Sequence, residues 1–266
     1  MTPYDAPVSA YMTPSVRTIA RSARLAEAHA ILREHNFSAL VVTAGGEPVG
    51  VLSRTDLLRV GRVAASSRRG APLLALPDAE VASAMSSPVA SVTPETSLRE
   101  AAREMLHRRV HRMVVRAEGG RLAGVLSTRD LMEAVRDAKA PATLGDFMTS
   151  PMLSVEALDT VGHATDLLED AHVAGVVVLE DGRAVGLFTQ TEALQARELP
   201  ATTPVEEVMN YALVCLDRGM AMHRAAANAL ATRARRVVVV DHRRACGVVT
   251  GFDFARALVA GGTTSP

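Results

Sequence analysis

The sequence predicts a mixed α/β (α+β) protein built from four β-α-β-β-α units that pair into two pseudo-symmetric modules. Three observations predict it: two landmarks that recur four times, a nearly constant spacing between them, and a fixed order in which the hydrophobic periodicity changes. One unit of about 50 residues buries too little apolar surface to be stable alone. We therefore expect the first unit to pair with the second, and the third with the fourth.

The landmarks are an opening methionine and a glycine that lies 38 or 39 residues further on. The glycine is followed by two apolar residues and then by Ser/Thr-x-x-Asp/Glu. A fixed distance between two motifs over four copies indicates an internal repeat. The four methionine and glycine pairs are Met12 and Gly50, Met85 and Gly124, Met148 and Gly186, and Met209 and Gly247.

The periodicity between the landmarks assigns the elements of each unit. A short β-prone segment follows the methionine, and a helical pattern of apolar residues comes next, as in Leu98, Ala101, Ala102 and Met105. Two β-branched runs joined by a turn then predict a hairpin, as in 176–179 and the residues after Gly182. A second helix begins at the Ser/Thr-x-x-Asp/Glu motif.

These patterns divide the chain into four repeats and one longer connection. We expect repeats at 8–60, 81–136, 144–196 and 205–259. Residues 61–80 are expected to form a linker, in which Ser66 to Pro72 is a flexible connection.

Composition and charge exclude several classes of protein. Lys+Arg 29 against Asp+Glu 29 gives no net charge, which argues against binding to nucleic acid or to an anionic membrane. The two cysteines, Cys215 and Cys246, form no CxxC pair, so neither a disulfide framework nor a cysteine-based zinc site is expected, and both are predicted to pack as small buried groups. No metal site is proposed.

The first residues lack a basic and apolar leader, and no apolar run reaches membrane-spanning length. We therefore expect a soluble, cytoplasmic protein.

The Ser53-x-x-Asp56 motif stands where a strand is expected to turn into a helix. The hydroxyl and the free N–H groups of the first helical turn form an anion site, and a carboxylate can accept two hydrogen bonds from a vicinal diol. A nucleotide offers both partners, as phosphate and ribose. The alternative is that the hydroxyl and the carboxylate form only a capping box, which needs no ligand.

With its four β-α-β-β-α units ending in Gly-h-h-Ser/Thr-x-x-Asp/Glu, the chain resembles the CBS-domain family, whose repeats pair into Bateman modules. Four repeats in one chain are similar to the γ subunit of AMP-activated protein kinase and to free-standing bacterial CBS proteins. The resemblance covers about residues 8 to 258. It implies adenosine-containing ligands in the cleft between paired repeats, with the landmark carboxylate on the ribose and the hydroxyl near the phosphate.

The resemblance also implies basic residues at the start of the first hairpin strand, which reach the phosphates of a nucleotide held by the partner repeat. The second and fourth repeats carry such pairs, whereas the first and third have Ser38-Ala39 and Ala174-Gly175. The cleft with the full set therefore lies in the first module. Its residues are Ser53, Thr55 and Asp56 of the first repeat and His111 and Arg112 of the second.

Three further clefts differ from the first in the carboxylate or in the basic pair. The corresponding cleft of the second module combines Thr189 and Glu192 with Arg235 and Arg236, and the longer Glu192 replaces the usual Asp. The remaining two keep the ribose carboxylate but face repeats without a basic pair. They are expected to hold either a nucleoside or a nucleotide whose phosphates meet Arg129 or the other module. Their landmark residues are Ser127 and Asp130 in the second repeat and Thr250 and Asp253 in the fourth.

No Walker A, HExxH, GxSxG or Rossmann glycine pattern is present, so we do not expect an enzyme or a catalytic cofactor. The first hypothesis is a regulatory protein that senses AMP, ADP or ATP and signals to a separate, unidentified protein. One alternative is a non-catalytic scaffold with degenerate clefts, and another is a sensor of S-adenosylmethionine, NAD or a cyclic dinucleotide. Whether one chain closes a four-repeat disc or two chains form a homodimer stays open.

Overall fold

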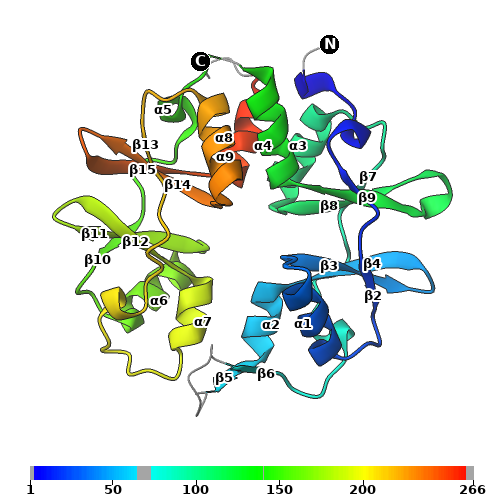
Figure 1. The fold of residues 1–266 in the computed structure, drawn as a ribbon, viewed down its shortest axis with the longest axis horizontal. Helices are drawn as coiled ribbons and strands as arrows, with labels where there is room; N and C mark the ends of the chain where they lie inside the picture. The colour runs from blue at the N-terminus through cyan, green and yellow to red at the C-terminus, as the bar shows by residue number, and fades with distance from the viewer. Residues whose placement is uncertain (1–2, 65–72, 140, 262–266) are drawn as a thin grey trace. The chain divides into compact units, whose positions relative to one another are not determined.

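The computed structural model describes residues 3–64, 73–139 and 141–261, and it has the predicted order of elements in each repeat (Figure 1). Each repeat consists of a short strand, a helix, a β-hairpin and a second helix. The prediction of four β-α-β-β-α units is therefore confirmed.

The first two repeats have the following elements. The first contains β1 (Thr13–Pro14), β2 (Thr18–Ala20), α1 (Leu25–Glu34), β3 (Ala39–Ala44), β4 (Glu47–Ser53) and α2 (Arg54–Val60). The second contains β7 (Ser91–Val92), α3 (Leu98–Arg108), β8 (Arg112–Arg116), β9 (Leu122–Ser127) and α4 (Thr128–Ala138).

The other two repeats follow the same order. The third contains α5 (Leu144–Phe147), β10 (Ser154–Glu156), α6 (Val161–Asp170), β11 (Gly175–Glu180), β12 (Arg183–Thr189) and α7 (Gln190–Ala196). The fourth contains β13 (Cys215–Asp217), α8 (Met222–Thr232), β14 (Arg236–Asp241), β15 (Arg244–Thr250) and α9 (Gly251–Val259).

Each repeat has its own small sheet, in which the opening strand runs parallel to the first strand of an antiparallel hairpin in the first, third and fourth repeats. The strand orders are β2-β3-β4, β1-β9-β8-β7, β10-β11-β12 and β13-β14-β15. The hairpin register shifts by one residue beside the landmark glycine in three repeats. Such a bulge bends and twists the strand just before it enters the second helix.

The chain divides into two compact units, and the division crosses the hairpin of the second repeat. Unit 2 consists of residues 14–91 and 114–125, which include the whole first repeat. Unit 1 consists of residues 1–13, 92–113 and 126–266, which include the helices of the second repeat and both later repeats. We describe each unit by itself.

The opening segment of a repeat packs onto its partner repeat rather than onto its own. In unit 2, the backbone of Glu80 pairs with Arg24 at the start of α1, and Val81 and Met85 pack with the core of the first repeat. In unit 1, Pro204 pairs in the same way with Thr160 at the start of α6. Because each segment completes its partner's core, neither member of a pair is a self-sufficient domain.

The same exchange occurs in the opposite direction within unit 1. Thr143, which opens the third repeat, pairs with Ala221 before α8 of the fourth, and Pro7 pairs with Ser97 before α3. The apolar residues that follow these contacts are completely buried. They are Val8, Val81, Leu144 and Val205, each with 0% exposure.

The two sequence landmarks meet across three of these exchanges. In unit 1, a Cβ at Gly247 would lie 2.6 Å from Sδ of Met148, and one at Gly186 would collide with Met209. In unit 2, a Cβ at Gly50 would lie 2.8 Å from both Sδ of Met85 and the backbone oxygen of Ser86. In each contact, the glycine of one repeat meets the methionine of its partner repeat. The expected pairing of the third repeat with the fourth is therefore observed within unit 1.

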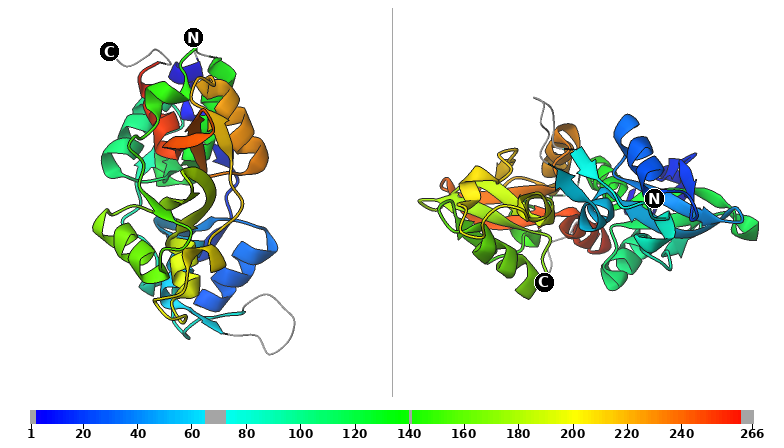
Figure 2. Two further views of the ribbon diagram at one scale, coloured as in Figure 1. Left: turned by 90° about the vertical axis from the view of Figure 1, so that its left-hand side faces the viewer. Right: turned by 90° about the horizontal axis from the view of Figure 1, so that it is seen from below.

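Helices of the second and fourth repeats form a second interface inside unit 1. Helix α4 packs against α8 and α9, and α3 packs against α9, as Figure 1 shows in green, orange and red. The same two helices of the fourth repeat lie together in the left view of Figure 2. Each of these helices carries buried alanines, including Ala134 of α4, Ala229 of α8 and Ala257 of α9. These small side chains let the helix axes approach closely.

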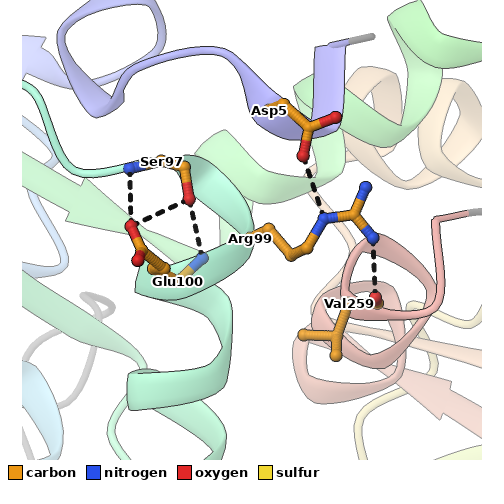
Figure 3. A network of polar contacts seen from close by, with 5 residues as sticks. All are labelled: Asp5, Ser97, Arg99, Glu100 and Val259. Atoms are coloured by element: carbon orange, nitrogen blue, oxygen red, sulfur yellow. Dashed lines mark hydrogen bonds and ion pairs between the residues drawn. The ribbon is translucent and has the colours of Figure 1, made fainter.

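Arg99 of α3 ties the two ends of unit 1 to this interface (Figure 3). Its Nε donates to Oδ1 of Asp5 at 3.0 Å, and its Nη1 donates to the carbonyl of Val259, at the end of α9, at 3.0 Å. A single guanidinium thus holds the N-terminal segment, α3 and the last helix together.

The segment 61–80, expected to be a linker, carries a two-stranded ribbon of β5 (Arg62–Ala64) and β6 (Leu73–Ala75), and the expected flexible stretch from Ser66 to Pro72 lies outside the described residues. The expectation that both cysteines are buried is wrong. Cys215 is exposed rather than buried, because it lies on β13 at the edge of its sheet, and Cys246 is only partly buried.

We predict that Gly50→Ala destabilises the protein by about 1–3 kcal/mol, because the new methyl group meets the backbone oxygen of Ser86 as well as Met85. Urea denaturation measures the loss. Gly219→Ala is the matched control, since its methyl group would meet only the side-chain oxygen of Asp217, at 3.1 Å. Equal effects of the two substitutions would show that the contact between glycine and methionine does not stabilise the pair.

Candidate ligand-binding site

All four Ser/Thr-x-x-Asp/Glu motifs lie where a hairpin strand turns into the second helix of its repeat. In each, the hydroxyl residue is the N-cap and the carboxylate three residues later accepts a hydrogen bond from its backbone N–H. The capping box is therefore complete in every repeat without a ligand. The pairs are Ser53 with Asp56, Ser127 with Asp130, Thr189 with Glu192, and Thr250 with Asp253.

Each capping box uses only one carboxylate oxygen, and the second oxygen distinguishes the repeats. Oδ1 of Asp56 lies 3.5 Å from Arg59, and Oδ1 of Asp253 is paired with Arg256. Asp130 and Glu192 are each only 8% exposed, and their second oxygen makes no hydrogen bond or ion pair to a described residue. These two carboxylates can therefore accept new hydrogen bonds without losing an internal partner.

The environment of Asp130 disfavours its charged form. Burial raises the pKa of Asp130 to about 6, although the backbone N–H and the hydroxyl of Ser127 donate to it at 2.6 and 2.8 Å and act in the opposite direction. Two ligand hydroxyl groups that donate to Asp130 would favour the charged form, because hydrogen bonds to a carboxylate lower its pKa.

The second-module residues predicted from the sequence come together within unit 1. A Cβ at Gly175 would lie 3.0 Å from the guanidinium carbon of Arg236 and 2.9 Å from the methyl group of Thr189. Burial lowers the pKa of Arg236 and Arg235 adds to this, while Glu192 acts in the opposite direction. Gly175 thus leaves the room in which the arginine of the fourth repeat reaches the landmark of the third.

The basic pair of the second repeat lies near the basic pair of the fourth. Partial burial lowers the pKa of His111, and Arg112, Arg236 and Arg235 lower it further. The ring of His111 stacks on Phe252 of α9, with ring centroids 4.2 Å apart and planes inclined by 20°. We call His111, Arg112, Arg235 and Arg236 the arginine cluster.

The predicted first-module site has residues in both units. Ser53, Thr55 and Asp56 belong to unit 2, in which Oγ of Ser53 donates to Asp56 at 2.6 Å. His111 and Arg112 belong to unit 1. Their combination into one cleft therefore stays a prediction.

Arg129 makes a contact between repeats, and its role toward a phosphate stays a prediction. Its Nη2 donates to the carbonyl of Leu230 in the last turn of α8, at 3.0 Å, and so ties the second repeat to the fourth. The start of α4 also abuts the start of α9, since a Cβ at Gly251 would lie 2.6 Å from the hydroxyl of Thr128. The landmarks of the second and fourth repeats are therefore neighbours.

Sequence reasoning missed three residues of this region: Gly175, Gly251 and Phe252. The glycines had no recognisable signal, because a close approach between repeats is visible only once the helices are placed. Phe252 did offer one, since a large aromatic residue stands next to the landmark Asp253 in a chain with only 3% aromatic residues.

Among the described residues, no three His, Cys, Asp or Glu side chains are grouped in a way that could hold a metal ion. None of the described helices has the length and apolar character to cross a membrane.

Comparison with known proteins identifies the repeats. The model of the CBS domain matches residues 8–62, 80–137, 144–198 and 205–260. The uncharacterized protein MJ1404 of Methanocaldococcus jannaschii is 25% identical over 272 residues; the match covers 94% of this chain and 61% of that protein, so the chain spans less than two thirds of its length. The CBS domain-containing protein YhcV of Bacillus subtilis is 29% identical over 117 residues, which covers 43% of this chain and 84% of YhcV.

Two solved structures share the fold over nearly the whole chain. Protein MJ1225 from Methanocaldococcus jannaschii, described as a candidate archaeal homologue of the γ subunit of AMP-activated protein kinase, superimposes with a TM-score of 0.74 at 16% identity, covering 94% of this chain and 99% of that one. An uncharacterized conserved protein from Pyrococcus horikoshii superimposes with a TM-score of 0.69 at 19% identity, covering 96% and 100%. At these identities the likeness concerns the fold.

We predict that Asp130→Asn stabilises the protein at pH 8 by about 1–3 kcal/mol, because the buried carboxylate no longer has to ionise. The folded-state pKa is raised from 3.8 to about 6, so the wild-type protein loses this stability as pH rises from about 4 to about 6. The advantage of the variant should vanish near pH 4. Denaturation curves at pH 4, 6 and 8 measure it.

Glu100→Gln at the exposed capping box of α3 (Figure 3) is the control, and it should show no comparable gain. A pH-independent difference between Asp130→Asn and wild type would show that Asp130 holds no proton in the folded protein.

Proposed function

Because the chain belongs to the CBS-domain family, we propose that it is a regulatory protein that binds AMP, ADP or ATP in clefts between paired repeats and signals to a separate partner protein. CBS-domain proteins generally bind regulatory ligands and do not catalyse reactions. The finer assignment to adenine nucleotides rests on the side chains of unit 1.

The observation that carries the proposal is the approach of Arg236 of the fourth repeat to Thr189, the capping partner of Glu192, at Gly175 of the third. Glu192 has an oxygen without an internal partner, which suits the two hydroxyls of a ribose. Arg235 and Arg236 supply planar guanidinium groups, which suit a phosphate. One nucleotide presents both kinds of group, so it could occupy the carboxylate and the arginines together.

The arginines also favour a phosphorylated ligand over an uncharged nucleoside. Arg235, Arg236 and Arg112 all repel a positive charge on His111. Binding of an anion among these residues is therefore favourable. A sensor of nucleotides would use that gain to shift the packing of the fourth repeat against its neighbours, and the partner protein would bind one of the two arrangements.

The second candidate function is a scaffold whose clefts bind nothing. It is favoured by one observation: all four capping boxes are complete without a ligand. The two functions differ in whether adenine nucleotides change the stability of the protein, because a ligand that binds only the folded state raises its melting temperature.

We predict that AMP, ADP or ATP binds the full chain in calorimetric titrations and that Arg235→Ala weakens binding by about 10- to 100-fold, the value of one charge-assisted hydrogen bond. Glu192→Gln, which keeps a capping acceptor for Thr189, should also weaken it. Arg103→Ala, an exposed arginine on α3 outside the arginine cluster, is the matched control and should leave binding unchanged.

Three results would count against the proposal. Heat and thermal shifts absent with all three nucleotides would favour the scaffold. Binding of S-adenosylmethionine but not of nucleotides would replace the ligand class. Equal binding by the wild type, Arg235→Ala and Glu192→Gln would remove the ligand from the cleft of the third and fourth repeats.

A further inference from the structure

His111 is the one member of the arginine cluster that can lose its charge near neutral pH. An arginine side chain keeps its charge at any pH a protein tolerates, whereas an imidazole titrates close to pH 6.5. His111 immediately precedes the first residue of β8, and its backbone oxygen accepts from the N–H of Thr128 at the start of α4 at 3.1 Å. The side chain is partly exposed to solvent, so an anion and a proton can both reach it.

The charged groups that act on His111 are all cationic among the described residues. They are Arg112, its neighbour in sequence, and Arg235 and Arg236 at the start of β14. Among the described residues, no carboxylate contributes to the shift of the His111 pKa, whereas Glu192 acts on Arg236. The protein without an anion therefore holds His111 in its neutral form near pH 7.

An anion with several charges reverses this balance. Phosphate oxygens that bind the arginines replace a repulsion at His111 by an attraction, and an attraction from opposite charge favours the protonated form. The ring of Phe252 adds to this, since it covers one face of the imidazole at a centroid distance of 4.2 Å and an aromatic face attracts a cation. The protonated form then has favourable contacts both with the anion and with α9.

We propose that anion binding at the arginine cluster is coupled to the uptake of a proton by His111, so that the protein responds to pH as well as to its ligand. The proposal rests on the proposed function, because it describes how that site is regulated. The coupling is reciprocal: if the anion favours the proton, then a lower pH favours the anion. Since Phe252 belongs to α9, the protonated His111 also strengthens the contact between the second and fourth repeats.

The experiment is calorimetric titration of the full chain with ATP at pH 7, in buffers of different ionisation enthalpy. The slope of the observed enthalpy against the buffer enthalpy gives the number of protons taken up. ATP titrates in this range too, so the informative quantity is the difference between wild type and His111→Gln. We expect about half a proton more in the wild type, and a loss of affinity in His111→Gln that is several-fold at pH 6 and small at pH 8.

His107→Gln is the matched control, because His107 is an exposed histidine on α3 outside the arginine cluster, and it should behave as the wild type. Phe252→Leu should reduce the proton uptake while leaving ATP binding at pH 8 nearly unchanged. A histidine NMR titration gives a second readout, in which the pKa of His111 should rise on addition of ATP.

The outcomes separate this inference from the proposed function. ATP binding with equal proton uptake in wild type and His111→Gln overturns the coupling and leaves the proposed function standing. If ATP does not bind, inorganic tripolyphosphate is titrated in the same way. Its binding with uptake that depends on His111 supports the coupling and refutes a nucleotide ligand, and the absence of binding by both refutes both proposals.

Discussion

A repeat of about 50 residues has too little apolar surface to close a core of its own, and the exchange of opening segments between paired repeats meets this constraint. Val205 and Met209 of the fourth repeat complete the core of the third, and Val81 and Met85 of the second complete the core of the first. The partner repeat is thus part of the folding unit. A change at one of these positions alters the core of a repeat distant in sequence.

The same exchange determines what surrounds each landmark turn. The glycine that precedes the turn contacts the partner's methionine, and the bulge beside that glycine directs the strand into the second helix. In the second module this arrangement places Gly175 beside both Thr189 and Arg236, and Glu192 lies close enough to Arg236 to favour its charge. The proximity of these groups is therefore a consequence of how the repeats complete each other.

The order of elements could be predicted from the sequence because it depends on local patterns. Helical spacing in α3 and α8 and β-branched runs in the hairpins gave the type of each element, and the repeated spacing of methionine and glycine gave the number of units. The capping boxes were also visible, since a hydroxyl and a carboxylate three residues apart at a helix start form one by local geometry alone.

The arrangement of the charged residues could not be predicted, because it depends on which helices pack against each other. Nothing in the sequence near Arg129 indicates that it donates to Leu230, a residue of another repeat. Likewise the whole third repeat separates His111 from Arg236 in the sequence, and their proximity follows from the packing of α4 against α8 and α9. Contacts between repeats that are not paired leave no periodic signal.

Some charged side chains have a partner inside the protein and stabilise the fold, whereas others lack such a partner and are available to a ligand. Asp56 and Asp253 have an arginine three residues further on, so their charge is balanced within one helix. Asp130 and Glu192 are equally buried but keep an oxygen without such a partner, and His111 is surrounded by like charges. A carboxylate oxygen without a partner and an imidazole among like charges both gain from a ligand that supplies hydrogen-bond donors and negative charge. Their common location in unit 1 is accounted for if a ligand with both hydroxyl groups and negative charge supplies the missing partners.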